Sequence, residues 1–310
     1  MDVALVISGN SFVGRHLCRR LAQLGIAYQA TSRAPQPGFL VCDLKAAHDL
    51  DRVLALARPR WVFVCSGATP QSGPHRLAAM HVTATESLLQ SVVRHVPDAV
   101  TVLFGSAAEY GRVAPEQLPI REETPACPES AYGKSKLSQF ELAQKLAALH
   151  KLRIHVVRPF NILGPGLGRH LVAGALCERL LQAKRQGRSG VIPIVSGQAT
   201  RDWVDVRDVA DAVLRLALDA PPSPGTVGLF NIATGIETPV LTLADYLCRL
   251  AGEFHAVDAG ADDLSSPVDR SCGDASKLRA ETGWRPRFTW QQSAEALWNR
   301  VVRSVSEPRP

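Results

Sequence analysis

The sequence predicts an α/β protein, with a doubly wound parallel sheet in the first half of the chain and a smaller, looser unit behind it. Two observations support this prediction. Short apolar runs alternate with amphipathic helical patterns as far as about residue 161, and Gly/Pro-rich connections dominate after it. Buried strands that alternate with helices form parallel sheets, because each helix returns the chain to the same edge. At 310 residues the chain is long enough for such a sheet and a second unit.

Individual elements follow from these patterns in chain order. The apolar runs predict strands at Val3–Ile7, Tyr28–Thr31, Phe39–Cys42, Trp61–Cys65, Val100–Phe104 and Ile154–Val157. Between these strands, helical periodicity predicts helices at Val13–Leu24, Leu44–Ala57, Met80–His95 and Ala131–Leu149. Further helices are predicted at Leu171–Lys184, Val206–Leu218, Leu241–Leu250, Ala275–Thr282 and Gln291–Arg303.

Composition excludes several classes of protein. With 46% hydrophobic and 21% charged residues, the chain is typical of a soluble globular protein. No apolar run approaches the roughly 18 residues of a membrane span, and the N-terminus starts a strand pattern without an apolar leader, so we expect a cytoplasmic protein with no membrane partner. Lys and Arg are dispersed, so the net charge of +6 suits an anionic small substrate better than nucleic acid. The seven cysteines form no C-x-x-C pair and are expected to be buried thiols, not metal ligands.

A candidate cofactor loop joins the first predicted strand to the first predicted helix. It reads Ile7-Ser8-Gly9-Asn10-Ser11-Phe12-Val13-Gly14. Such a junction brings backbone N–H groups and the positive helix end to a dinucleotide pyrophosphate. Serines stand at the first two glycine positions of a G-x-x-G-x-x-G loop. The pattern predicts cofactor contacts, and a plain strand-to-helix turn is the alternative. The predicted contacts are Gly9, Ser11, Phe12 and Val13.

The end of the second predicted strand bears on the choice of cofactor. NAD enzymes usually place an acid there against the adenosine ribose, but this chain has Ser32 and Arg33. Both side chains suit a 2′-phosphate, so NADP(H) is favoured and NAD(H) is the alternative. Asp43 and Leu44, after the third strand, are expected beside the adenine, and Asp43 as the N-cap of the next helix is the other interpretation.

A Tyr-x-x-x-Lys pattern marks the start of the helix predicted over 131–149. Tyr132 and Lys136 are four residues apart, so they lie on one face of that helix. A nearby ammonium favours the phenolate, which brings proton exchange closer to neutral pH. Ser106 follows the Val100–Phe104 strand, at the carboxyl edge where sites of open α/β sheets form. We predict that Ser106, Tyr132 and Lys136 carry the chemistry.

Ordered motifs along nearly the whole chain add a family resemblance. Besides the loop and the Tyr132–Lys136 pattern, they are Arg158-Pro-Phe-Asn161, Gly164-Pro-Gly166, Arg201-Asp-Trp-Val-Asp-Val-Arg-Asp-Val209, Phe230-Asn231 and Gly273-Asp274. In these motifs the chain resembles the extended short-chain dehydrogenase/reductase family, which contains nucleotide-sugar epimerases, dehydratases and reductases. We therefore expect residues 1–161 to form mainly a Rossmann-type dinucleotide-binding domain and 162–310 mainly a substrate domain, with about 205–235 returning to the first.

The resemblance also implies roles for single residues. It implies hydride transfer between a substrate carbon and a nicotinamide, with Ser106, Tyr132 and Lys136 handling the proton. Further cofactor contacts are implied for Ser66, Gly67, Ala68, Pro159 and Phe160, and substrate contacts for Asn161, Arg201 and Arg270. Asn161 would touch the diphosphate side of the substrate, and Arg201 would pair with a phosphate through its planar fork.

Residues next to the predicted triad narrow the activity. Sugar 4,6-dehydratases of this family place acids directly after the triad Ser/Thr, where this chain has Ala107 and Ala108, so dehydration is not expected. The stretch 105–125 is similar to that of GDP-4-keto-6-deoxy-mannose reductases, which form GDP-D-rhamnose. An NAD(P)H-dependent 4-ketoreductase acting on a nucleotide-linked 4-keto-6-deoxyhexose, with GDP favoured, is therefore the first hypothesis. A C4 epimerase is the second, and a dinucleotide-binding sensor without turnover is the third.

Three features depart from the family pattern. His81 stands where the family has an asparagine, and we expect it to pack or to form hydrogen bonds rather than to catalyse. Ser8 and Ser11 replace the first two glycines of the family's glycine-rich loop. An Arg-Pro-x-Asp-like substrate element appears only as Ser266-Pro-Val-Asp269, beside Arg270.

A homodimer is expected as well. In related enzymes the helices that correspond to residues 80–95 and 131–149 form a four-helix bundle between two subunits. Apolar side chains suit that role or, alternatively, the role of facing the sheet. They are Leu88, Leu89, Val92, Val93, Leu142, Leu146 and Leu149.

Overall fold

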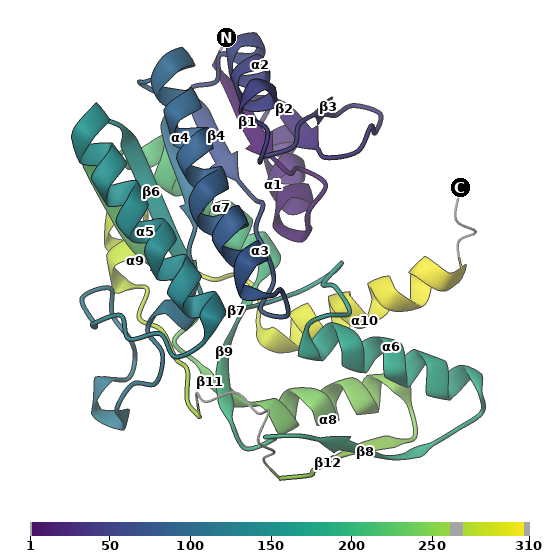
Figure 1. The fold of residues 1–310 in the computed structure, drawn as a ribbon. Coiled ribbons are helices and arrows are strands. Elements are labelled where there is room, and N and C mark those ends of the chain that lie inside the picture. Colours follow the sequence, from purple (N-terminus) through teal and green to yellow (C-terminus); the bar gives the residue numbers. More distant parts are fainter. Residues whose placement is uncertain (1, 261–268, 307–310) are drawn as a thin grey trace.

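A seven-stranded parallel sheet forms the larger part of the molecule (Figure 1). The structure is a computed structural model, and it describes residues 2–260 and 269–306. The strand order is β10-β6-β5-β4-β1-β2-β3. The strands are β1 (Val3–Ile7), β2 (Ala27–Ser32), β3 (Leu40–Val41), β4 (Trp61–Val64), β5 (Val100–Phe104), β6 (Arg153–Pro159) and β10 (Thr226–Ile232). The order reverses between β1 and β4, which is where ligands bind in open α/β sheets.

Helices cover both faces of this sheet (Figure 1). They are α1 (Phe12–Gln23) and α7 (Val206–Asp219) on one face, and α2 (Ala47–Ala57), α4 (Ala84–His95) and α5 (Ala131–His150) on the other. Along β1, Ala4 and Val6 belong to the apolar cluster under α1 and α7, whereas Leu5 and Ile7 belong to the cluster under the other helices. Alternate side chains of a strand point to opposite faces, so this apolar strand requires a layer on each side. The predicted doubly wound α/β fold is confirmed.

The smaller part of the molecule contains two short sheets covered by helices. One has the order β11-β9-β7 and the other pairs β12 with β8. The elements are β7 (Asn161–Leu163), α6 (Val172–Arg185), β8 (Gly190–Ile194), β9 (Thr200–Asp205), β11 (Glu237–Pro239), α8 (Val240–Ala251), β12 (Phe254–Asp258) and α10 (Trp290–Ser306). The sequence pattern predicted none of these strands, because short strands within Gly/Pro-rich segments show no sustained alternation.

The chain passes between the two parts more than once. β7 follows β6 almost directly and pairs with β9 of the smaller part. After β9, α7 packs against α1, and β10 joins the edge of the large sheet beside β6 before the chain reaches β11. The helix α9 (Ser276–Thr282) then returns to contact α7 and β10. As a result, Asn161 and β9 lie next to the carboxyl ends of the large sheet.

Two helices begin elsewhere than predicted. α2 starts at Ala47 with Ala46 at its N-cap, and the Asp43 carboxylate instead accepts a hydrogen bond from the Lys45 N–H (3.0 Å). Asp43 as a helix N-cap is therefore wrong. The helix α3 (Pro74–Ala78) and a π-helical turn (Ala79–Thr83) precede α4 without a break. The helical segment thus begins at Pro74, a residue suited to the first turn of a helix.

The apolar side chains considered for a dimer face mostly pack inside the subunit. Leu88, Leu89 and Val92 are completely buried in the cluster beneath α4 and α5, and Leu146 is nearly so. Leu149, at the end of α5, is exposed. Most of these side chains therefore face the sheet, as the alternative interpretation expected. They do not support a homodimer, which stays a prediction.

Two bulk features can be compared with the structure directly. All seven cysteines are free thiols, and only Cys127 is exposed. Among the helices of residues 2–260 and 269–306, none has the combined length and apolar character that crossing a bilayer requires.

Candidate active site

Ser106 and Tyr132 meet at the carboxyl end of β5. Ser106 follows β5, and Tyr132 lies in the first turn of α5, where the Ser130 hydroxyl caps the helix by accepting from the Gly133 N–H (3.0 Å). A Cβ atom at position 133 would lie 2.3 Å from the Ala108 carbonyl oxygen, so only glycine lets the helix start this close to the turn after Ser106. The side chains of Ser106 and Tyr132 share a hydrogen bond. The structure thus brings this predicted pair together.

Lys136 lies one helical turn further on and is almost fully buried. Its ammonium donates to the Phe104 carbonyl (2.6 Å) and to Gln139 Oε1 (3.0 Å), and Gln139 in turn donates to Thr85 (2.9 Å). Burial lowers the pKa of Lys136 to about 8, and the nearby Glu109 carboxylate opposes this shift. The lysine is therefore held firmly at the end of β5 with a weakened preference for its charged form.

Tyr132 differs from the expectation in its acidity. Its pKa is raised to about 12, chiefly by burial; the hydrogen bond with Ser106 lowers it, and Glu109 raises it further. The expectation that Lys136 would lower this pKa is wrong in this structure, because desolvation of the phenolate dominates and the ammonium is bound to Phe104 and Gln139. Tyr132 is thus a protonated phenol at neutral pH.

A buried ion pair, which sequence reasoning missed, supports Ser106. Glu109 Oε1 accepts from the Ser106 N–H (2.8 Å), and Glu109 Oε2 accepts from Arg158 Nε and Nη2 (2.8 and 2.7 Å). The Arg158 guanidinium lies over the rings of Tyr110 and Phe140. The signal for Glu109 was present in the sequence, since Ser106-x-x-Glu109 is a capping-box pattern. The pair fixes the backbone on which Ser106 stands.

The loop between β1 and α1 is tightly packed despite its serines. Ser8 adopts a left-handed backbone conformation (φ 58°), which glycine would adopt without strain. A Cβ atom on Gly9 would lie 2.7 Å from the Ala30 Cβ atom, and one on Gly14 would lie 2.4 Å from the Ser8 oxygen. Ser11 is the N-cap of α1 and accepts from the Gly14 N–H (3.1 Å). The two remaining glycines therefore stand where a side chain would collide, and Phe12 and Val13 form the first turn of α1.

The predicted adenosine side carries one uncompensated cation. Arg33 is exposed, and no hydrogen bond or ion pair holds it within residues 2–260 and 269–306. Ser32 is buried and donates to the Ala34 carbonyl (2.6 Å). Leu44 is buried beyond β3. Arg33 is therefore available to a phosphate, whereas the Ser32 hydroxyl already has a partner.

The loop after β4 contains predicted cofactor contacts and lies beside the predicted catalytic residue Lys136. The Ser66 hydroxyl is buried and has no hydrogen-bond partner among the described residues. A Cβ atom on Gly67 would lie 3.3 Å from His81 Nε2 and 3.7 Å from Lys136 Nζ, and the Ala68 N–H donates to His81 Nε2 (3.1 Å). A hydroxyl without a partner, a closely packed glycine and the N-terminal turn of α1 all lie along one sheet edge. These residues fit a dinucleotide.

The predicted substrate residues fall into two groups. Asn161 begins β7 opposite Trp203 of β9. Arg201, on β9, donates to the Thr200 carbonyl (2.7 Å), and no carboxylate of the described residues lies within ion-pair distance of it. Arg270 instead donates from Nε and Nη2 to Glu237 (3.0 and 2.5 Å). Asp269 acts on the charge of Arg201 from beyond ion-pair distance, whereas the charge of Arg270 is paired directly with Glu237.

Pro159 and Phe160 were predicted to contact the cofactor. Pro159 ends β6, and Phe160 is buried against Tyr110, Ile120 and Ala233. Phe160 therefore supports the site from the core side. In the Ser266-Pro-Val-Asp269 element, residues 266–268 lie outside the described residues.

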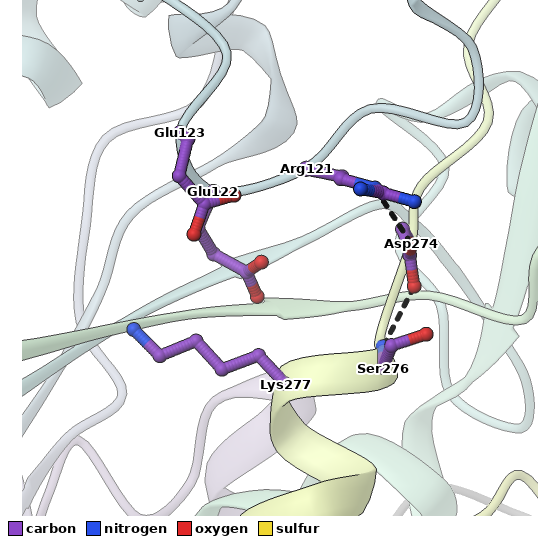
Figure 2. A pocket seen from close by; sticks show the side chains of 6 residues that line it. All are labelled: Arg121, Glu122, Glu123, Asp274, Ser276 and Lys277. Carbon is purple, nitrogen blue, oxygen red and sulfur yellow. Dashed lines mark hydrogen bonds and ion pairs between the residues drawn. The ribbon is translucent and has the colours of Figure 1, made fainter.

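A separate surface pocket contains none of the predicted site residues. It is lined by Arg121, Glu122, Glu123, Asp274, Ser276 and Lys277. Figure 2 shows Arg121 and Ser276 directed at Asp274 from two sides, with Arg121 Nε 3.2 Å from the carboxylate. Glu122 accepts from the Asn231 N–H (2.7 Å), and Lys277 donates to the Leu229 carbonyl (3.0 Å). Arg121 thus pairs with Asp274, and the side chains of Glu122 and Lys277 bond to the backbone of β10.

Comparison with known proteins supports one family. Residues 4–233 match the model of the NAD dependent epimerase/dehydratase family. The dTDP-6-deoxy-L-talose 4-dehydrogenase (NAD(P)(+)) of Kitasatospora kifunensis is 29% identical, over 94% of this chain and 93% of that protein. The GDP-6-deoxy-D-mannose reductase of Pseudomonas aeruginosa is also 29% identical, over 98% of this chain and 99% of that protein.

A solved structure extends the similarity to the fold. The structure of RMD from Pseudomonas aeruginosa complexed with NADPH has a TM-score of 0.84 and 27% identity, and covers 97% of this chain and 98% of that one. The family match spans the β1–α1 loop, Ser106, Tyr132, Lys136 and Arg201. The chain belongs to the NAD dependent epimerase/dehydratase family.

Proposed function

We propose that this protein is an NAD(P)H-dependent 4-ketoreductase acting on a nucleotide-linked 4-keto-6-deoxyhexose, with GDP favoured as the nucleotide. The observation that carries the proposal is the hydrogen-bonded pair of Ser106 and Tyr132, with Lys136 one turn away, at the carboxyl edge of the sheet. By their names, the two relatives above act on 6-deoxy sugars attached to a nucleotide. Their names also describe oxidation or reduction without loss of water.

The protonated state of Tyr132 at neutral pH suits the reductive direction. A phenol that stays protonated at neutral pH is suited to donate its proton to a ketone oxygen, with Ser106 as the second hydrogen-bonding group on that oxygen. When bound, a reduced nicotinamide supplies the hydride that protein side chains lack. Tyr132 Oη then loses its proton to the new alcohol, and the positive charge of Lys136, one helical turn away, favours the resulting phenolate.

The remaining predicted residues receive roles in this proposal. Cofactor contacts are assigned to Gly9, Ser11, Phe12, Val13, Ser32, Arg33, Asp43, Leu44, Ser66, Gly67, Ala68, Pro159 and Phe160, besides Tyr132 and Lys136. The uncompensated Arg33 supports NADP(H) over NAD(H). Asn161 and Arg201 are assigned to the diphosphate of the substrate. Arg270 can join them only if it leaves Glu237.

Two features near Ser106 argue against a dehydratase activity: the alanines that follow it, and the engagement of the nearest carboxylate by other groups. Ala107 and Ala108 follow Ser106 directly, and Glu109 is the next residue. Its carboxylate is engaged by Arg158 and by the Ser106 N–H, so it is not free to exchange protons with a sugar. Elimination of water requires an additional acid and base, and the residues that follow Ser106 supply neither.

A panel of nucleotide-linked 4-keto-6-deoxy sugars, assayed with NADPH and NADH, tests the proposal. We expect the protein to purify with little bound cofactor, because serines replace glycines at the pyrophosphate loop, and to consume NADPH stoichiometrically while forming one C4 alcohol. A protein that carries tightly bound NAD and interconverts C4 epimers without added reductant is the second candidate, an epimerase. Cofactor binding without turnover on any sugar would identify the third, a sensor.

A further inference from the structure

His81 lies at the junction of the Ser66–Ala68 loop and the catalytic turn of α5. It is completely buried and belongs to the π-helical turn Ala79–Thr83, immediately before α4. A π-helical turn widens a helix by one residue per turn, and such turns occur frequently at functional sites. Here it places an imidazole between two segments that the proposed function assigns to cofactor and catalyst.

The hydrogen bonds around His81 define its tautomer. The Ala68 N–H donates to Nε2 (3.1 Å), so Nε2 carries a lone pair. The Ser135 hydroxyl donates its single proton to the Tyr132 carbonyl (2.8 Å), so it can only accept at its contact with His81 Nδ1 (2.8 Å). Nδ1 therefore carries the proton. The chain of contacts runs from Ala68 through His81 and Ser135 to the backbone of Tyr132.

Two further contacts link the imidazole to the reactive side chains. Its ring meets the Tyr132 ring edge-on, with the centroids 5.6 Å apart. A Cβ atom on Gly67 would lie 3.3 Å from His81 Nε2 and 3.7 Å from Lys136 Nζ, so Gly67 packs against both groups. The ionisable groups that face this region are Tyr132, Lys136 and Glu109, and the charge of Lys136 together with burial lowers the pKa of His81 to about 3. The ring therefore stays neutral beside the ammonium.

We propose that His81 is a positioning residue for catalysis: its neutral imidazole spans the Ser66–Ala68 loop and the Tyr132–Lys136 turn and sets where the Tyr132 hydroxyl lies relative to the nicotinamide side. This inference rests on the proposed function of the site. A shift of about 1 Å between reacting groups can lower a rate about 100-fold. An imidazole with one hydrogen-bond partner in each segment can thus hold the two segments at a fixed separation.

Three substitutions at His81 test its two hydrogen bonds separately. His81→Phe keeps the ring shape and removes both hydrogen bonds, and we expect kcat to fall by about 10- to 100-fold. His81→Asn keeps a donor near the Nδ1 position, and His81→Gln keeps an acceptor near Nε2. Each should retain more kcat than His81→Phe, with the KM for the sugar changed less than kcat.

Ser135→Ala tests the same chain from its other end. Because His81→Phe and Ser135→Ala interrupt one series of contacts, the loss of kcat in the double variant should be smaller than the product of the two single losses. Multiplicative losses would show that the two residues act independently and would overturn the proposal.

His155→Phe is the matched control, since His155 is also buried, donates from Nε2 to the Ala220 carbonyl oxygen (2.9 Å) and meets Phe230 edge-on. It should lower the melting temperature without lowering kcat. Equal kcat losses in the two Phe variants, or a kcat within twofold of wild type in His81→Phe, would overturn the proposal. So would the loss of a limb of the pH–kcat profile in His81→Asn, because that result would make His81 a proton-transfer group.

Nitrogen-15 NMR of the histidines gives a readout that does not depend on activity. We expect His81 to remain an Nδ1-protonated neutral ring from about pH 5 to pH 8, the range in which an ordinary histidine titrates. Titration in that range, or an Nε2-protonated ring, would overturn the proposal. Absence of any turnover in the wild-type protein would refute the proposed function instead, and the tautomer would still be measured.

Discussion

The proposed catalytic end of the site and its proposed phosphate-binding end are built in different ways. Around Tyr132, the side chains of Lys136, Glu109 and His81 are buried, and each has at least two hydrogen-bond contacts. Arg33 and Arg201, by contrast, form no ion pair with a carboxylate of the described residues, and Asp269 acts on Arg201 only from a longer distance. Proton transfer requires geometry that is fixed before the substrate arrives, whereas a long cation can reach a phosphate from several positions.

The difference also affects stability. A buried charge network is costly when it loses one member, because the remaining charge is left without water or a partner. An exposed arginine can be removed at little cost to the fold. Substitutions at the catalytic end should therefore affect turnover and folding strongly, and those at the phosphate end should affect mainly ligand affinity.

The largest expected effect is on turnover. Tyr132→Phe removes one hydroxyl, so it should lower kcat by about 10²- to 10⁴-fold, as expected for a lost general acid, while cofactor affinity stays the same. Stopped-flow measurement of NADPH oxidation checks this. Tyr28→Phe, at an exposed tyrosine of β2, is the control and should behave as wild type. Near wild-type turnover in Tyr132→Phe would remove the proposed mechanism.

The buried ion pair should dominate the effects on folding. Arg158→Met leaves Glu109 buried without its partner and should lower the free energy of unfolding by about 3–5 kcal/mol. Adding Glu109→Gln should restore part of this loss, because the unpaired charge disappears. Denaturant titrations measure both. Arg249→Met breaks an exposed pair with Asp245 and should cost about 0–1 kcal/mol; a similar cost in Arg158→Met would contradict the comparison.

Because the pKa of Lys136 is lowered in the folded protein, we expect Lys136 to make the free energy of unfolding depend on pH. Its folded-state pKa of about 8 lies below the ordinary 10.5, so the unfolded chain binds more protons between these values. Lys136 therefore contributes a rise in the free energy of unfolding as pH increases through that window, whereas six thiols whose pKa values are raised above 9 contribute a fall. The slope should accordingly be lower in Lys136→Met than in wild type, and the difference between the two slopes isolates the contribution of Lys136. The comparison is made below pH 10, where Tyr132, with a pKa raised from 10 to about 12, remains protonated in both states. The same slope in variant and wild type would show that Lys136 is not the source.

The smallest expected effect concerns cofactor choice. Arg33→Ala removes a charge-assisted contact that only NADPH can make, so it should weaken NADPH binding by about 10- to 100-fold and leave NADH binding unchanged. The melting temperature should not move, because Arg33 is exposed and unpaired among the described residues. Binding titrations with both cofactors measure the difference, and equal losses would rule out Arg33 as the 2′-phosphate ligand.

Local patterns alone were enough to predict much of this molecule. Strands and helices from β1 to β6 follow from the periods of apolar residues, because backbone geometry repeats over a few residues. The alignment of Tyr132 and Lys136 on one face follows from the same geometry. The position of Ser106 follows from its place at the end of a predicted strand, since parallel strands end at a common edge.

Only the tertiary structure decided which distant residues meet. Arg158 lies 49 positions after Glu109, and Glu237 lies 33 before its partner Arg270; no local period relates such pairs. β10 joins the large sheet because the chain returns to it after β9, a return that the family resemblance implied for about 205–235 but that no local period indicates. The pKa of Tyr132 was mispredicted for a related reason: the sequence shows that an ammonium is near, but burial and the other partners of that ammonium depend on how β5 and α5 pack.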